Sequence, residues 1–152
     1  MITSPAQVDE TRRLISEVKE ELLKEGKSFK DDIPLGVMIE TPAAAIISDY
    51  LADRCDFFSI GSNDLTQYIN AVDRENTDVA HLYDELHPAV LRMIKHSVLS
   101  ASQADIPISV CGEMAGMAKD EIKSRTEEML KLVGLSSEKH RIKGFSRGMK
   151  QR

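Results

Sequence analysis

The chain has 152 residues, 41% of them hydrophobic and 30% charged, which is typical of one globular domain with a sizeable core. The net charge of −5 argues against a nucleic-acid partner, because neutralising phosphates requires a concentrated positive surface. No apolar run approaches the roughly 20 residues that span a bilayer, and two cysteines do not make a disulfide framework, so we expect a cytoplasmic protein without membrane insertion.

Strands and helices are predicted to alternate along the chain, which indicates an α/β protein with a parallel sheet. Helices are expected from Ser4 to Gly26, over 42–52, as a short turn over 66–72, and from His87-Pro88 onwards. Strands are expected over 35–39, 57–60 and 106–110. Each strand is a short, mostly apolar run, so we expect strands that are buried on both faces.

A residue capable of chemistry follows each predicted strand: Glu40, Asp64 and Cys111. The carboxyl ends of parallel strands form the site in such folds, so we expect these side chains to share one crevice. Two carboxylates suit Mg²⁺, which usually takes one or two carboxylates together with substrate oxygens. Taken singly, each carboxylate also fits a helix N-cap or a solvated loop, and Cys111 fits a small buried hydrophobe. Their equivalent positions on successive strands favour the shared site.

Five motifs follow one another along the first part of the chain: GVMIETP at 36–42, FFSIGSNDLTQY at 57–68, AVDR at 71–74, HLY at 81–83 and CGEMAG at 111–116. In this order they resemble the phosphoenolpyruvate-binding barrel of enzyme I of the bacterial sugar phosphotransferase system. The resemblance covers residues 1–117. The residues Gln67-Tyr68 and His81-Leu82-Tyr83 within these motifs favour enzyme I over pyruvate phosphate dikinase and phosphoenolpyruvate synthase.

This resemblance implies a partial TIM-type β/α barrel and a role for each matching residue. Glu40 and Asp64 would bind Mg²⁺, and Asn63, Asp64 and Arg74 would bind phosphoenolpyruvate. Cys111 would be catalytic, as the donor of the proton that converts enolpyruvate to pyruvate. The alternative for Arg74 is a loop ion pair of little energetic value. His81 and His87 are expected to be structural, because neither lies in the family's phosphohistidine motif.

The last part of the chain has a different character. A charged helix is predicted over 120–133, and residues 120–152 resemble the helical subdomain and signature motif of ABC transporter ATPases, through TEEMLKLVGL at 126–135 and GFSRGMKQR at 144–152. No Gly-rich loop ending in Lys-Ser or Lys-Thr is present, so we expect no ATP hydrolysis. The sequence therefore predicts a chimera of two domains, residues 1–117 and residues 118–152.

The leading hypothesis is a fragment of a phosphoenolpyruvate-protein phosphotransferase that binds Mg²⁺ and phosphoenolpyruvate without completing turnover. No segment resembles the family's swivelling phosphohistidine domain, and only part of the barrel is recognisable. An inert chimera, engineered or recombined, and a nucleotide-binding ABC ATPase fragment remain alternatives. A partial barrel exposes sheet edges and its inner face, so self-association into a homo-oligomer is also expected.

Overall fold

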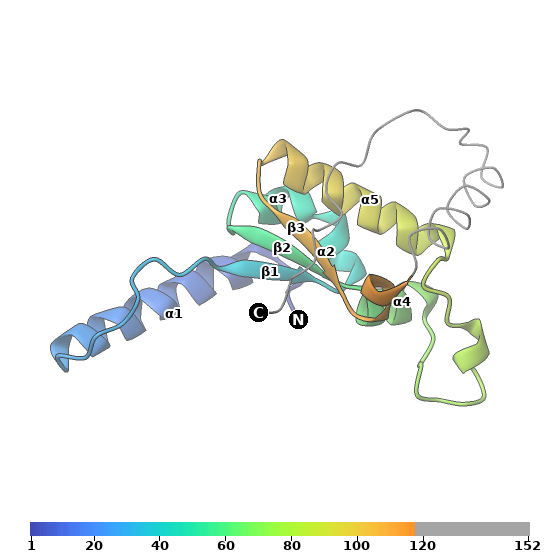
Figure 1. The fold of residues 1–152 in the computed structure, drawn as a ribbon, viewed down its shortest axis with the longest axis horizontal. Helices are drawn as coiled ribbons and strands as arrows, with labels where there is room; N and C mark the ends of the chain where they lie inside the picture. The colour runs from blue at the N-terminus through green and yellow to red at the C-terminus, as the bar shows by residue number, and fades with distance from the viewer. Residues whose placement is uncertain (118–152) are drawn as a thin grey trace.

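The structure is a computed structural model that describes residues 1–117. Its centre is a three-stranded parallel sheet in the order β1 (Gly36–Ile39), β2 (Phe57–Gly61) and β3 (Ile108–Cys111), drawn in Figure 1. The predicted α/β class and parallel sheet are therefore confirmed. The predicted helix over 120–133, the segment compared with ABC ATPases and the proposed domain boundary at 117/118 lie outside the described residues.

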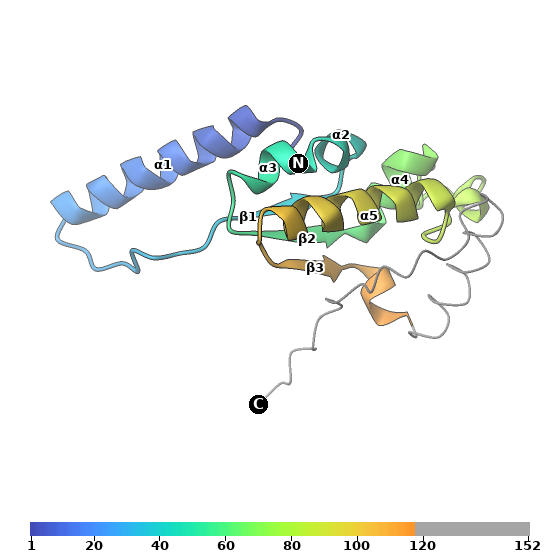
Figure 2. The ribbon, with the colours of Figure 1, turned by 90° about the horizontal axis from the view of Figure 1, so that it is seen from above.

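Helices connect the strands and cover one face of the sheet, as Figure 2 shows from above. The longer helices are α1 (Pro5–Lys24), α4 (Ser62–Asn70) and α5 (Pro88–Gln103). The shorter ones are α2 (Pro42–Ile46), α3 (Ser48–Ala52) and the 3₁₀ turns η1 (Ala80–Leu82) and η2 (Glu113–Gly116). Sequential parallel strands with helices on one face are the arrangement of a β/α barrel segment.

The two faces of the sheet differ in burial. Val37, Ile39, Phe58 and Ile60 point toward the helices and are at most 3% exposed. Met38, between two of these residues, is 42% exposed, because nothing in residues 1–117 covers that side. The prediction that the strands are buried on both faces was therefore wrong for the described part of the chain. A strand's side chains alternate between faces, and here only one face has a covering layer.

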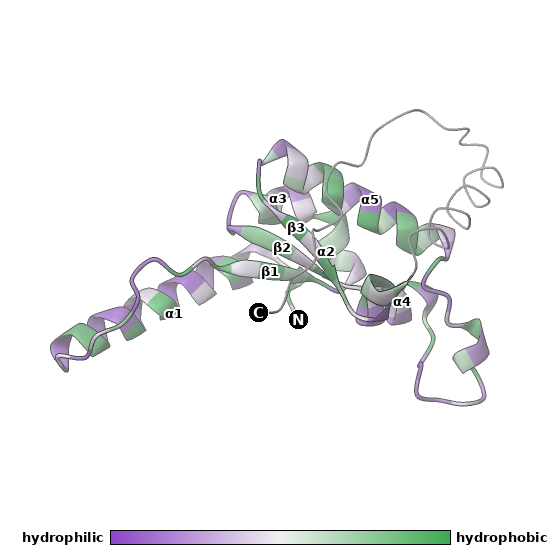
Figure 3. Ribbon diagram, in the orientation of Figure 1, coloured by the Kyte–Doolittle hydropathy of each residue, from purple (hydrophilic) through white to green (hydrophobic). Residues whose placement is uncertain are grey.

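Helix α1 begins where the sequence predicted. Pro5 occupies its first turn, and the side chain of Gln7 accepts a hydrogen bond of 3.0 Å from the backbone N–H of Ser4. Only Val8 of this helix is buried, and its C-terminal part extends away from the sheet (Figure 1). Hydrophobic residues recur along α1 between hydrophilic ones (Figure 3), and several of them, such as Leu14, Val18 and Leu23, are exposed.

Two element boundaries differ from the prediction. The Ala-rich segment is two short helices rather than one, because the chain departs from helical geometry at Ile47. Helix α4 begins at Ser62, directly after β2, and not at Thr66. The Gly-Ser-Asn-Asp sequence is therefore the start of a helix and not a separate turn, which puts Asn63 and Asp64 in its first turn. Within residues 1–117, no helix is both long enough and apolar enough to span a membrane.

Candidate functional site at the carboxyl ends of the strands

Glu40 follows β1 and lies against the end of β2. A Cβ atom added to Gly61 would be 2.9 Å from Cβ of Glu40 and 3.3 Å from its Oε2. Such distances are too short for any residue larger than glycine without a shift, so Gly61 permits this approach. The Glu40 side chain is partly exposed. The carboxylate after β1 therefore reaches the position where α4 starts.

Asp64 forms an ion pair with Arg74 at this helix start. The Oδ1 atom of Asp64 is 3.2 Å from Nη1 of Arg74, and both side chains are about one-third exposed, at 33% and 35%. The backbone N–H of Arg74 donates to Oε1 of Gln67 at 3.2 Å, which ties the following loop back onto α4. Arg74 therefore does form an ion pair from its loop, as the alternative interpretation expected. The partner in this ion pair is Asp64, the residue proposed as a metal ligand.

Asn63 and Ser62 join α4 to the end of β3. The side-chain oxygen of Asn63 accepts a hydrogen bond of 2.9 Å from the backbone N–H of Glu113, and the buried hydroxyl of Ser62 donates to the carbonyl of Cys111 at 3.0 Å. Gly112 lies between them with φ +92°, where a Cβ atom would be 2.5 Å from Oδ1 of Asn63. Both its conformation and its surroundings require glycine. These contacts fix the Asn63 amide, so that its NH₂ group remains for another acceptor.

Cys111 lies on the open face of the sheet. Its register partner is Gly61, and its thiol donates to the carbonyl of Ile60 at 3.2 Å and accepts from the hydroxyl of Ser59 at 3.4 Å. Cys111 is partly exposed, whereas Cys55, the second free thiol, is only 6% exposed and its burial raises its pKa. The two cysteines therefore occupy different environments, and only Cys111 is within the strand-end site.

Tyr83 and Glu85 also belong to this region. Tyr83 is part of the HLY motif at 81–83 but had no predicted role, and Glu85 was not predicted at all. The hydroxyl of Tyr83 donates to the backbone carbonyl of Asn63 at 3.2 Å and lies 3.5 Å from Oε1 of Glu85. Glu85 is 6% exposed, and its pKa is raised by burial and by the neighbouring charge of Glu113. Burial and the charge of Glu85 in turn raise the pKa of Tyr83. A buried glutamate has no signature in a single sequence, so only the structure reveals it.

The charges at the site are mostly negative, with Arg74 as the basic group among Glu40, Asp64, Glu85 and Glu113. An anionic ligand would need a cation beside these carboxylates. Residues 1–117 bring no three His, Cys, Asp or Glu side chains together as a metal cluster, so a cation here would depend on few protein ligands. Two carboxylates plus ligand oxygens is the usual environment of Mg²⁺.

The structure brings some of the predicted site residues into contact and leaves others as neighbours. Asp64 meets Arg74 directly, Asn63 bonds to the turn that follows Cys111, and Glu40 reaches the site through Gly61. Their roles toward Mg²⁺ and phosphoenolpyruvate stay predictions. His87 caps α5 by accepting from the N–H of Ala89 at 3.2 Å, as a structural histidine would.

The fold and site define a parallel β/α protein with charged side chains at its strand ends. Residues 1–151 match the model of a known family, described as "PEP-utilising enzyme, PEP-binding domain", where PEP is phosphoenolpyruvate. The chain therefore belongs to this family. The match runs through the segment compared with ABC transporter ATPases, and nothing in the comparisons supports that resemblance or a chimera.

Curated relatives agree with the family match. A phosphoenolpyruvate-protein phosphotransferase of Haemophilus influenzae is 49% identical over 117 residues, which are 76% of this chain and 20% of that protein. The proteins of the same name from Bacillus subtilis and Cupriavidus necator are 43% identical over 122 residues and 42% over 116 residues. These alignments cover 80% and 76% of this chain but 21% and 20% of those proteins. The chain thus spans about a fifth of the length of these relatives.

Proposed function

We propose that this chain is part of a phosphoenolpyruvate-protein phosphotransferase and that it binds Mg²⁺ and phosphoenolpyruvate at the carboxyl ends of its strands. The observation that carries the proposal is the ion pair between Asp64, in the first turn of α4, and Arg74, with Glu40 in close contact with Gly61 at the start of the same helix. A carboxylate can bind the metal ion of a metal–phosphate complex, and a guanidinium can bind its phosphate. When the ligand binds, Asp64 would contact Mg²⁺ in place of Arg74, and Arg74 would contact the phosphate in place of Asp64.

Glu40 and Asp64 are the proposed magnesium ligands. Both offer carboxylate oxygens, the donors that this hard cation prefers, and both lie at the ends of neighbouring strands. Mg²⁺ usually keeps several waters and takes further oxygens from the substrate, so two carboxylates can be enough to hold it. When bound, Mg²⁺ would offset negative charge on the phosphoryl group. The carboxylates of this chain would orient the ligand toward Arg74.

Arg74, Asn63 and the first turn of α4 would hold the phosphate. Arg74 provides a fork of donors suited to phosphate oxygens, and the NH₂ group of Asn63 is oriented by the bond between its oxygen and Glu113. No side chain caps the N-terminus of α4, whose first N–H groups lack intrahelical partners. A helix start of this kind favours a bound anion.

Cys111 would be the proton donor. After phosphoryl transfer, the enolate of pyruvate takes a proton at its methylene carbon, and the thiol of Cys111 would supply it and become a thiolate. Its partly exposed position on the open face, with Ser59 beside it, fits a group that must reach a ligand. We propose further that turnover needs more than residues 1–117. These residues form three strands of a barrel, and His87 caps a helix instead of accepting a phosphoryl group.

Isothermal titration calorimetry with phosphoenolpyruvate in the presence of Mg²⁺ tests this function. We expect saturable heat from the unmodified chain and its loss in Asp64→Ala, because the variant lacks a metal ligand and leaves Arg74 unpaired. Asp78→Ala, which removes an exposed loop carboxylate, is the matched control and should bind normally. Equal heats from the Asp64→Ala variant and the unmodified chain would refute the site.

A further inference from the structure

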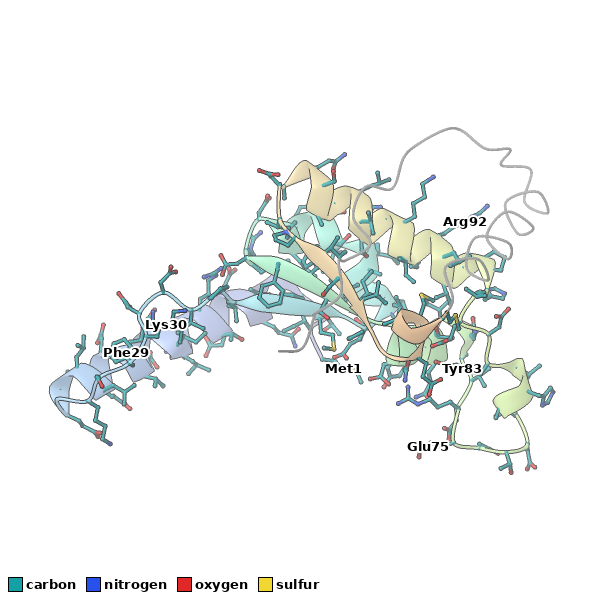
Figure 4. All side chains as sticks on the ribbon, viewed as in Figure 1. Met1, Phe29, Lys30, Glu75, Tyr83 and Arg92 are labelled. Carbon is teal, nitrogen blue, oxygen red and sulfur yellow. The ribbon has the colours of Figure 1, made fainter. Side chains whose placement is uncertain are left out.

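The loop between α4 and α5 carries Arg74 and is anchored at several points to α4. The backbone N–H of Arg74 bonds to Gln67, and the side-chain NH₂ of Asn70 donates to the carbonyl of Asp84 at 3.1 Å. The Tyr83 hydroxyl adds the contact to Asn63. In Figure 4, Tyr83 lies at the base of this loop, close to the strand ends, whereas Glu75 lies farther out. The base of the loop thus has fixed contacts with the helix that carries Asp64.

The contact from Tyr83 is made to a proposed binding residue. Its hydroxyl bonds to the backbone carbonyl of Asn63, whose side-chain oxygen accepts a second hydrogen bond from the N–H of Glu113. Asn63 is therefore fixed at two points, one on its backbone and one on its side chain. A tyrosine hydroxyl, with an ordinary pKa of about 10, is protonated at neutral pH and can donate.

Glu85 is a second feature that the proposed chemistry does not use. It is 6% exposed, and its carboxylate lies within 3.5 Å of the Tyr83 hydroxyl. Burial and Glu113 of η2 oppose its charged form and raise its pKa, whereas Tyr83, Ser62 of α4 and Arg74 favour the charged form. A buried carboxylate costs stability unless it is well hydrogen-bonded. Glu85 lies beside residues of α4, of the loop that carries Arg74 and of η2, so a positioning role would explain why this costly group is kept.

We propose that Tyr83 and Glu85 are positioning residues, which together hold Asn63 and the loop base carrying Arg74 in the arrangement that receives a phosphate group. The single proton of the Tyr83 hydroxyl is shared between two acceptors, the carbonyl of Asn63 at 3.2 Å and Oε1 of Glu85 at 3.5 Å. Glu85 thereby holds the hydroxyl against the backbone of Asn63. Neither residue touches the ligand. This inference rests on the proposed function, because the phosphate is that of phosphoenolpyruvate.

Titration of phosphoenolpyruvate with Mg²⁺ into three variants tests the pair. Tyr83→Phe removes one hydroxyl, and we expect about fivefold weaker binding, the effect of losing one hydrogen bond. Glu85→Ala should weaken binding to a similar extent, and Glu85→Gln should restore it, since the amide oxygen also accepts a hydrogen bond. Tyr68→Phe and Glu75→Ala change the same residue types at exposed positions and should bind like the unmodified chain.

A second measurement follows Arg74 itself without any ligand. The NMR signal of its Nε–H group, assigned by its loss in Arg74→Lys, should shift in Tyr83→Phe and not in Tyr68→Phe. If Glu85→Ala does not fold, Tyr83→Phe and this signal decide the matter. Normal binding and an unshifted Arg74 signal in Tyr83→Phe would overturn the positioning role and leave the proposed function intact. Absence of binding by the unmodified chain would instead refute the proposed function, and this inference with it.

Discussion

The two faces of the three-stranded sheet show how this chain separates folding from chemistry. On the covered face, Phe58 and Ile60 are fully buried under the helices. On the open face, the neighbouring positions hold Ser59 and Gly61, next to Cys111 of β3. Adjacent residues of one strand therefore have different roles, one in core packing and the other on the face of the proposed site, because successive side chains point to opposite sides. Substitutions on one face should change stability, and those on the other should change reactivity or binding.

The largest effect is expected from Phe58→Ala. The ring is completely buried, and its loss should lower the free energy of unfolding by about 3–5 kcal/mol through lost burial and the cavity left behind. Phe57→Ala is the matched control, since Phe57 lies on the open face and is 36% exposed. Denaturant unfolding followed by circular dichroism measures both. Similar losses in the two variants would contradict the difference between the faces.

Gly112→Ala should have the next largest effect, on both stability and binding. A methyl group there meets Asn63 and Ser62 at a positive φ, so we expect a destabilisation of roughly 1–3 kcal/mol and weaker binding of phosphoenolpyruvate. Gly116→Ala, whose added Cβ meets nothing within 4 Å, is the control. Thermal unfolding and calorimetry report the two effects. A Gly112→Ala variant with normal stability would show that the turn adapts without strain.

The two cysteines should differ in reactivity by at least about tenfold, because the thiolate is the reactive form and requires access. Cys111 is partly exposed, whereas burial both shields Cys55 and raises its pKa. Iodoacetamide labelling followed by peptide mass spectrometry gives the two rates, and Mg²⁺ with phosphoenolpyruvate should slow the reaction of Cys111 alone. Faster labelling of Cys55 would contradict the described burial.

Self-association should follow from the open face and the unpaired sheet edges. Met38 and Phe57 are exposed there, on a face that residues 1–117 leave without a covering layer. Multi-angle light scattering over a concentration series should show a mass above that of one chain, and Phe57→Ser should reduce it. A constant monomer mass at all concentrations would refute this prediction.

The smallest effect concerns pH. Burial and Glu113 raise the pKa of Glu85, so the folded state retains a proton that the unfolded state has released. The free energy of unfolding should therefore fall as pH rises from the ordinary glutamate range through the raised pKa of Glu85. The Glu85→Gln variant has no carboxyl group to ionise here, so its free energy of unfolding should not show this decrease. The difference in free energy of unfolding between the variant and the unmodified chain should therefore grow across that pH interval. Urea unfolding at several pH values tests this; a constant difference would contradict the buried charge.

Much of the fold was predictable because its signals are local. Pro5 and Gly26 bracket α1, Pro88 starts α5, and the apolar runs identify the three strands of residues 1–117 within two residues. The family motifs also selected the residues that the structure gathers at the strand ends. The break at Ile47 and the early start of α4 were missed, since packing overrides the weak preferences of single residues.

The sequence by itself determined the order of strands and helices, the class of the fold and the membership of the family, because periodicity, caps and motifs act over short stretches of chain. Only the tertiary structure decided which face of the sheet is covered, that Arg74 pairs with Asp64, and that Glu85 is buried beside Tyr83. These features depend on the approach of segments that are distant along the chain or joined by irregular loops. Contacts of that kind arise from packing and electrostatics in three dimensions.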